Sequence, residues 1–275
     1  FTELAAMSHA QQAHTIELKD SHSLILDLFS GQKLNTRTQT ATLQYCEKER
    51  TAQVLSAEED VDSEEYQRRS RVGGIVQTTT VLREMLGGDD RAAVRLRRYL
   101  LLILGPAASG KTTLLKTFMM EMVHRYADFV PVLMPIIEVV PVLNDCKRNE
   151  GESVVAAFIH HKYPQHAHLL LQMMLMSRAV FLVDGIDESG TNREVVQDFI
   201  TVELLEPGHK TIITSRHSGF SSDAFRQCRV VELLPLSAKQ RAQMVRRRVP
   251  DREKAEQLVN EISSEAFEEI ASNPL

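Results

Sequence analysis

Tryptophan is absent from this chain of 275 residues, and aromatic residues make up only 5% of it. Proteins that bind single-stranded nucleic acid commonly stack the bases on exposed aromatic rings, so this composition disfavours such a function. The formal net charge of -5 provides no general attraction to nucleic acid or to an anionic membrane. The sequence therefore carries no clear nucleic-acid signal.

Cysteines are equally scarce. The chain has three, Cys46, Cys146 and Cys228, and they form no C-x-x-C pair or His/Cys cluster that would suggest zinc. Isolated thiols are typical of a reducing compartment, so we expect a cytoplasmic protein. No uninterrupted apolar run is long enough to cross a bilayer, and we expect no transmembrane segment.

The most informative stretch is LLILGPAASGKTT, which is an apolar run, then a turn, then the start of a helix. It matches G-x-x-x-x-G-K-[ST], the phosphate-binding P-loop. Gly105 leaves the strand without obstructing the turn, and Gly110 lets backbone approach the phosphates. Successive N–H groups and the positive end of the following helix then face one concavity. The predicted nucleotide-binding residues are Gly105, Pro106, Ala107, Ala108, Ser109, Gly110, Lys111, Thr112 and Thr113.

A second chemical group follows the apolar stretch Ala179–Asp184. Ligands bind at the carboxyl ends of strands in open parallel sheets, so Asp184 is placed to bind Mg²⁺ together with the hydroxyl of Thr112. Asp187 or Glu188 could polarise an attacking water as a general base. Alternatively, these carboxylates only cap the next helix.

A third group is Thr214-Ser215-Arg216, which ends the next apolar stretch. We expect Arg216 to contact a γ-phosphate and to distinguish triphosphate from diphosphate. The alternative is an ordinary surface arginine after a strand.

Apolar strands alternate with helical segments from residue 99 onwards, which predicts a mostly parallel sheet covered on both faces. The expected fold is α/β, a P-loop NTPase three-layer sandwich with a helical N-terminal arm and the start of a C-terminal helical subdomain. We expect one strand over Phe129–Val140, and helices over Ser237–Arg248, Asp251–Ile262 and Ser264–Ala271.

The N-terminal region reads as helical and polar up to about residue 56, with a modest apolar face that includes Leu24–Phe29 and ends at Gly31. Its histidines, His9, His14 and His22, read as solvated helix residues rather than ligands. An acidic run at residues 58–65 reads as a solvated linker, because it has no EF-hand pattern.

These three motifs, in this order, resemble the NACHT class of signal-transduction ATPases (the STAND class, which includes NOD-like receptors) over about residues 95–275. The resemblance implies that D-G-I-D-E from Asp184 is an extended Walker B motif and that Arg216 is the first sensor. It also implies that Pro274, in Asn273-Pro274-Leu275, packs against adenine. One departure is Ala108, where the family usually has glycine; any positive φ there would be strained.

The expected domains are 1–70, a helical and polar N-terminal region with linker; 71–236, a NACHT-like nucleotide-binding domain; and 237–275, the beginning of a helical subdomain. The ends at Phe1 and Leu275 are abrupt, so we expect a piece of a longer protein.

The function that these motifs favour is an ATP-binding, Mg²⁺-dependent signalling switch with slow NTP hydrolysis that controls conformation and self-association. GTP is less favoured because no N-K-x-D motif occurs. We expect protein partners or a self-oligomer. A small-molecule or nucleoside kinase, and a non-hydrolysing nucleotide-stabilised scaffold, are the alternatives; a DNA-handling ATPase is weaker, because the basic cluster Arg246–Arg248 lies beside Asp251 and Glu253.

Overall fold

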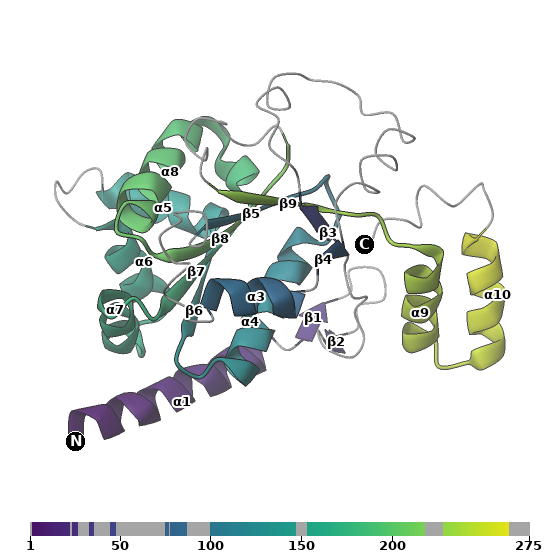
Figure 1. Ribbon diagram of the computed structural model, residues 1–275, viewed down its shortest axis with the longest axis horizontal. Coiled ribbons are helices and arrows are strands. Elements are labelled where there is room, and N and C mark those ends of the chain that lie inside the picture. Colours follow the sequence, from purple (N-terminus) through teal and green to yellow (C-terminus); the bar gives the residue numbers. More distant parts are fainter. Residues whose placement is uncertain are drawn as a thin grey trace.

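The computed structural model describes residues 2–22, 24–26, 33–35, 45–47, 75–76, 78–86, 100–146, 153–217 and 228–263. Its centre is a seven-stranded sheet in the order β4-β3-β9-β5-β8-β7-β6 (Figure 1). The strands are β3 (Tyr45–Glu47), β4 (Ile75–Val76), β5 (Leu100–Leu104), β6 (Val130–Pro135), β7 (Ala179–Asp184), β8 (Lys210–Ser215) and β9 (Arg229–Leu233). The five strands from β9 to β6 run parallel, and β3 and β4 are antiparallel at one edge.

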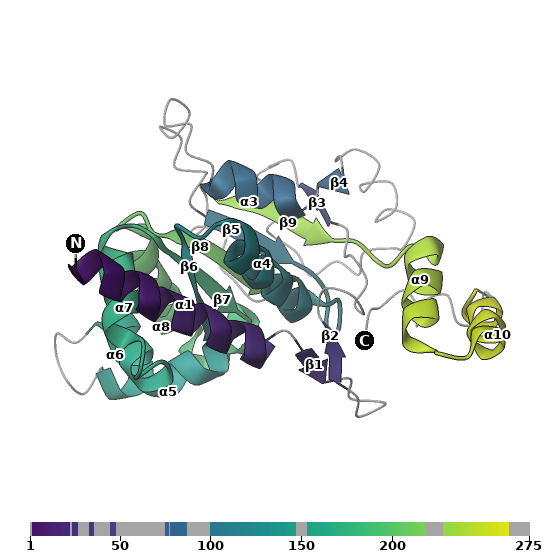
Figure 2. The same ribbon diagram turned by 90° about the horizontal axis from the view of Figure 1, so that it is seen from below.

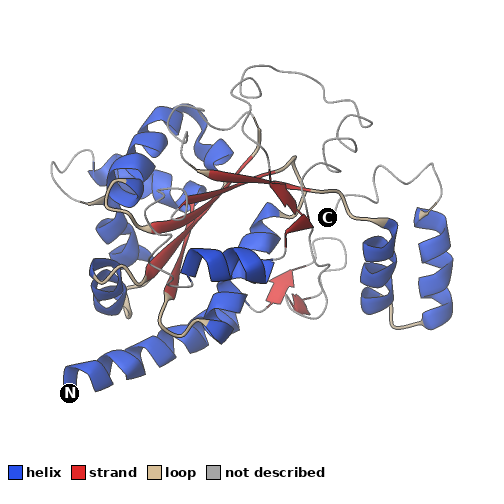
Figure 3. Cartoon of the chain, in the orientation of Figure 1, coloured by secondary structure: helices blue, strands red, loops and turns tan. Residues whose placement is uncertain are grey.

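The parallel strands are apolar almost throughout because helices cover both of their faces (Figure 3). Successive residues of β5 point to opposite sides. Leu102 and Leu104 belong to the core that packs on α5 (Ile136–Cys146), α6 (Val154–Lys162), α7 (Ala167–Leu175) and α8 (Arg193–Phe199). Leu101 and Ile103 belong to the core beneath α3 (Thr78–Leu86) and α4 (Lys111–Arg125). This arrangement confirms the predicted three-layer α/β fold.

Helix α1 (Thr2–His22) packs against both α4 and α7 near the edge strand β6 (Figure 2). Leu18 is buried beneath α4, and the Gln11 side chain donates a hydrogen bond to the carbonyl of Ala127, which follows α4. The N-terminal region also supplies β3, which pairs with β9 in the central sheet. The structure therefore attaches this region to the nucleotide-binding fold at two places, while the division at residue 70 stays a prediction.

The last helices form a pair of their own beyond β9. α9 (Ala238–Arg248) begins with a capping box between Ser237 and Gln240, and α10 (Arg252–Ile262) is capped by Asp251. A small core that includes Val245, Ala255 and Val259 joins them. The predicted third helix at residues 264–271 lies outside the described residues, as does the acidic run at residues 58–65.

Two predicted elements are wrong in part. The N-terminal helix ends at His22, and Leu24–Leu26 forms β1, which pairs with β2 (Lys33–Asn35). A run of three aliphatic residues has no period that separates helix from strand, and here cross-strand pairing decides it.

The strand expected over Phe129–Val140 is instead β6 followed by helix α5, which begins at Ile136. The buried residues of α5, Ile136, Val139, Leu143 and Cys146, recur at helical spacing. Because residues 129–140 are apolar at nearly every position, the sequence alone does not show this helical period.

The expectation that His14 is solvated is also wrong, because only 1% of its surface is exposed. Its ring lies edge-on to Tyr163, with ring centroids 5.6 Å apart, and 4.9 Å from the ring of His166. His9, five residues earlier on the same helix, is exposed as expected.

Candidate functional site

The P-loop connects β5 directly to α4, as its motif predicts. The Gly105 N–H donates to the Ser215 carbonyl at 3.3 Å, which ties the start of the loop to the end of β8. A Cβ on Gly105 would lie 2.6 Å from Ser109 Oγ, so no larger residue fits this turn without displacing Ser109. The loop backbone is therefore held close to the strand ends on which the remaining site residues stand.

Two residues of the loop, Ala108 and Gly110, have left-handed backbone conformations. Gly110 has φ +86° and precedes the first residue of α4. Ala108 has φ +61°, which an L-residue with a Cβ adopts at a cost of about 1 kcal/mol. The strain expected at this departure from the family pattern is therefore present, and the loop adopts its turn in spite of it.

No side chain caps the start of α4 in the described structure, and its first turn contains no acidic residue. The N–H groups and the positive end of the helix dipole are thus not satisfied by a carboxylate, which is the arrangement that phosphate groups use. Thr112 and Thr113 lie in this first turn, and the Thr112 side chain is exposed. Thr112 can therefore offer its hydroxyl to an ion beside the loop.

Lys111 is folded over the loop. Its Nζ donates to the carbonyls of Gly105 at 2.9 Å and Pro106 at 2.7 Å. Burial lowers the pKa of Lys111, while the nearby carboxylate of Asp187 raises it. Neutral carbonyls are weaker acceptors than phosphate oxygens, so a bound phosphate would compete well for this ammonium group.

The carboxyl end of β7 carries Asp184, whose Oδ1 accepts a hydrogen bond from the Thr214 hydroxyl at 2.6 Å. The same hydroxyl accepts from the Gly185 N–H at 2.8 Å. Gly185 has φ +78°, and a Cβ there would contact the Glu188 carboxyl at 3.0 Å. The residue after Asp184 is therefore glycine for two physical reasons, conformation and space.

Asp187 and Arg216 form an ion pair, with Nε to Oδ2 at 2.9 Å. The Arg216 backbone N–H also donates to Asp187 Oδ1 at 3.0 Å. The Asp187 side chain is 10% exposed, while that of Arg216 is 52% exposed. Both carboxylate oxygens of Asp187 are thus engaged by one residue.

Glu188 lies in the adjacent turn η3 (Ile186–Asn192) and is exposed. Partial burial of its carboxyl group, reinforced by the charges of Asp184 and Asp187, raises its pKa although the residue as a whole is exposed. Opposing contributions come from Arg216 and Lys111. A carboxylate with a raised pKa is a better proton acceptor than an ordinary one.

The strand register explains how these groups meet. Leu104 is paired with Ser215 on one side and with Glu232 on the other, so the ends of β5, β8 and β9 are level. Asp184 at the end of β7 reaches β8 through Thr214. The structure therefore brings the P-loop, Asp184, Asp187, Glu188 and Arg216 to one edge of the sheet.

Sequence analysis missed one polar pair at the same edge. Glu232, near the end of β9, lies 2.5 Å from His217 Nε2, and Glu232 is buried. The available signal was a single glutamate inside the apolar stretch RVVELL. Pro274, which was expected at the adenine, lies outside the described residues.

The donor set suits Mg²⁺. Asp184 Oδ1 is engaged by Thr214, which leaves Oδ2 for a cation, and Thr112 supplies a hydroxyl. In the described part of the chain, no group of three or more His, Cys, Asp and Glu side chains could hold a metal ion. Mg²⁺ often binds through one or two protein ligands with substrate phosphates completing its shell, so the residues present fit this ion.

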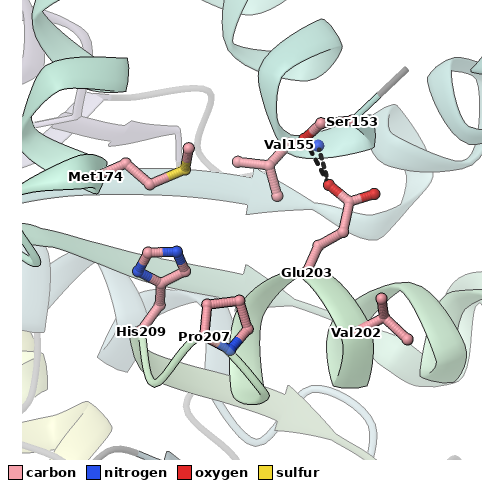
Figure 4. A pocket seen from close by; sticks show the side chains of 7 residues that line it. All are labelled: Ser153, Val155, Met174, Val202, Glu203, Pro207 and His209. Atoms are coloured by element: carbon pink, nitrogen blue, oxygen red, sulfur yellow. Dashed lines mark hydrogen bonds between the residues drawn. The ribbon is translucent and has the colours of Figure 1, made fainter. Parts of the chain in front are cut away.

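A separate hollow of about 460 Å³ lies where β8 begins, at the opposite end of the strand (Figure 4). It is lined by Ser153, Val155, Met174, Val202, Glu203, Pro207 and His209. The Glu203 carboxylate accepts hydrogen bonds from the N–H groups of Val154 at 2.9 Å and Val155 at 3.0 Å. Because this carboxylate already satisfies the start of α6, the hollow is not available there as an anion site.

Comparisons with known proteins agree with this geometry. A family model described as the NACHT domain matches residues 99–252, which is more than half of the chain. A search of curated proteins finds no significant match. No described helix is long and apolar enough to cross a membrane.

Solved structures show remote likeness. Domain III of the replication initiation protein DnaA from Thermotoga maritima has a TM-score of 0.43 at 15% identity, covering 70% of this chain and 78% of that chain. AMPPCP-bound DnaA from Aquifex aeolicus has a TM-score of 0.43 at 14% identity, covering 69% and 61%. PCH-2 from C. elegans has a TM-score of 0.33 at 14% identity, covering 61% and 42%. None of these values assigns a function.

Proposed function

Since this chain belongs to the NACHT domain family, we propose that it is an ATP-binding, Mg²⁺-dependent signalling switch that hydrolyses nucleotide slowly. The observation that carries the proposal is the meeting of a P-loop, a strand-end aspartate and an arginine–aspartate pair at one edge of the sheet. A P-loop alone indicates phosphate binding. The added groups are those that a magnesium–triphosphate site requires.

Each residue has a definable task in binding. The loop N–H groups between Gly105 and Gly110 cradle the phosphates, and Lys111 neutralises the β- and γ-phosphate oxygens. Thr112 and Asp184 would hold Mg²⁺, and the ion would neutralise part of the charge on the phosphate chain. ATP is preferred over GTP because the chain has no guanine-reading N-K-x-D motif.

Glu188 is the better candidate for the general base. Both oxygens of Asp187 are occupied by Arg216, whereas Glu188 is exposed and has a raised pKa. A base in this position would orient a water molecule for in-line attack on the γ-phosphate. Hydrolysis of ATP would be slow if the Asp187–Arg216 pair had to separate before each round of hydrolysis.

Arg216 provides the switch. Its guanidinium holds Asp187 and is half exposed, so a γ-phosphate can attract it away from the pair. We expect Arg216 and the turn after β7 to move together. This movement should shift the α9–α10 pair, which follows β9 in the chain. Exchange or hydrolysis would then change the packing of the helical subdomain and favour self-association or binding of protein partners in the cytoplasm.

The test is nucleotide binding by the wild type and by Lys111→Ala, with ATP and GTP in competition. Lys116→Ala is the matched control, since Lys116 lies on the same helix outside the loop. We expect Lys111→Ala to weaken ATP binding by about tenfold or more, because it removes the phosphate cation, and Lys116→Ala to bind normally. Equal binding by wild type and Lys111→Ala would contradict the phosphate site.

Assays of ADP formation and of phosphate release separate the alternative functions from the switch. A small-molecule kinase would form ADP only when a hydroxyl acceptor is added. A nucleotide-stabilised scaffold would bind ATP but release no phosphate, and replacement of Asp187 and Glu188 would change nothing.

A further inference from the structure

One buried hydroxyl holds the end of β7 to the end of β8. Thr214 has 0% of its surface exposed and stands one residue before the end of β8. Its Oγ1 donates to Asp184 Oδ1 at 2.6 Å and accepts from the Gly185 N–H at 2.8 Å. A single side chain therefore controls both the carboxylate and the backbone that follows it.

This contact takes over where the strand ladder stops. The register of β7 and β8 ends with Val183 opposite Ile213. Beyond that point the chain turns, because Gly185 has φ +78°. The Thr214 hydroxyl gives the Gly185 N–H the acceptor that a continued ladder would have supplied. The turn and the orientation of Asp184 are thus set together.

We propose that Thr214 is a positioning residue for Mg²⁺, which it serves by fixing the Asp184 carboxylate with Oδ1 bound and Oδ2 presented to the ion. This inference rests on the proposed function, because it needs Mg²⁺ and nucleotide to bind at this edge. Hydrogen bonds to the side chains that ligate a metal orient those ligands, and losing such a bond typically costs 10- to 100-fold in metal affinity.

The other hydroxyl residues of β8 do not make this contact. Thr211 is equally buried, but its Oγ1 donates to the His209 carbonyl at 3.0 Å, at the far end of the strand. Ser215 Oγ donates to the Arg216 carbonyl at 2.9 Å. Thr211 is therefore a matched control, since it has the same residue type, strand and burial but lies away from Asp184.

The experiment compares Thr214→Val, Thr214→Ser and Thr211→Val by binding of a fluorescent ATP analogue, first in EDTA and then with increasing Mg²⁺. Direct binding of Mn²⁺ to the nucleotide complex, followed by electron paramagnetic resonance, gives a second readout that needs no turnover. Valine keeps the shape of threonine and removes only the hydroxyl, while serine keeps the hydroxyl.

We expect Thr214→Val to bind the analogue in EDTA within about twofold of the wild type, because the phosphate contacts of the P-loop remain. The Mg²⁺ concentration needed for half of the cation effect should rise about 10- to 100-fold. Thr214→Ser and Thr211→Val should both resemble the wild type. If Thr214→Val does not fold, Thr214→Ala carries the same expectation, since it also removes the hydroxyl.

Two results would overturn the inference while leaving the proposed function intact. One is an unchanged Mg²⁺ requirement in Thr214→Val. The other is an equal loss of binding with and without cation, which would make Thr214 a purely structural residue. Absence of nucleotide binding by the wild type would instead refute the proposed function, and this inference with it.

Discussion

The buried ring of His14 should make the packing of helix α1 sensitive to acid. Neither ring nitrogen of His14 makes a hydrogen bond within the described structure. Charged or polar groups near the ring come from three places: Glu17 and His22 on α1 itself, Tyr163 and His166 between α6 and α7, and the backbone of Pro131 on β6. A proton on this ring would therefore place a charge in a site that offers it little solvation.

The sign of the effect follows from the pKa. Burial, with a further contribution from His166, lowers the pKa of His14 from 6.5 to about 4, against opposing contributions from the Pro131 backbone and Glu17. Above pH 6.5 the ring is neutral whether the protein is folded or unfolded, and pH has no effect. Between pH 6.5 and 4 the unfolded chain binds a proton that the folded chain does not, so stability falls as the pH falls.

The magnitude can be worked out for a change from pH 7.5 to pH 5.5. Each pH unit between the two pKa values costs about 1.4 kcal/mol, so His14 alone should lower the free energy of unfolding by about 1.4 kcal/mol. For a protein of this size that corresponds to a fall in Tm of roughly 3–5 °C. His22, whose pKa burial also lowers to about 4, acts in the same direction.

The assay is thermal unfolding at both pH values for the wild type, His14→Leu and His9→Leu. Leucine fills the His14 site without a titratable group, so its Tm should fall about 3–5 °C less than that of the wild type. His9 is exposed on the same helix, so His9→Leu should keep the wild-type pH dependence. Hydrogen exchange, corrected for the slower intrinsic rate at low pH, should show that the protection of α1 peptides falls at pH 5.5 more in the wild type than in His14→Leu.

This prediction is wrong if the wild type and His14→Leu lose the same stability between pH 7.5 and 5.5. It also fails if α1 exchange responds to pH equally in both proteins. A loss confined to other helices would locate the acid sensitivity away from His14.

Two further predictions concern the nucleotide site. Ala108→Gly should raise the free energy of unfolding by about 1 kcal/mol and Tm by about 2–4 °C, because glycine adopts φ +61° without strain; an unchanged or lower Tm would contradict this. Asp187→Asn should weaken the hold on Arg216 and increase the ratio of ATP to ADP affinity severalfold, measured by titration calorimetry, since a half-exposed pair contributes at most about 1 kcal/mol. An unchanged ratio would separate Arg216 from γ-phosphate sensing.

The features that sequence analysis found are those whose chemistry is local. The P-loop, the strand ending at Asp184 and the strand ending at Arg216 each carry their signal in a few consecutive residues. The parallel register then brings the three ends to one edge, and that edge follows from the fold class. The family model that matches residues 99–252 confirms the predicted resemblance to the NACHT class.

The missed features depend on partners distant in sequence. The residues next to His14 in the sequence do not indicate that Tyr163 and His166 will pack against its ring. The pairing of β3 with β9 joins residues about 190 positions apart, and a three-residue strand has too few residues to show a period. The contact of Thr214 with Asp184 needs the register of two strands to be known first.

The ion pair between Asp187 and Arg216 changes the roles that we assign to both residues. Each has a separate expected role in sequence analysis, one as a base and one as a sensor, but their ion pair makes them a single unit. If a γ-phosphate attracted the Arg216 guanidinium, Asp187 Oδ2 would lose its ion pair while the Arg216 backbone N–H kept Oδ1, and the uncompensated negative charge near Glu188 would increase. Since like charges raise the pKa of a carboxyl group, recognition of triphosphate should make Glu188 a stronger base. Recognition of the γ-phosphate and activation of the attacking water would thus be coupled through the Asp187–Arg216 ion pair.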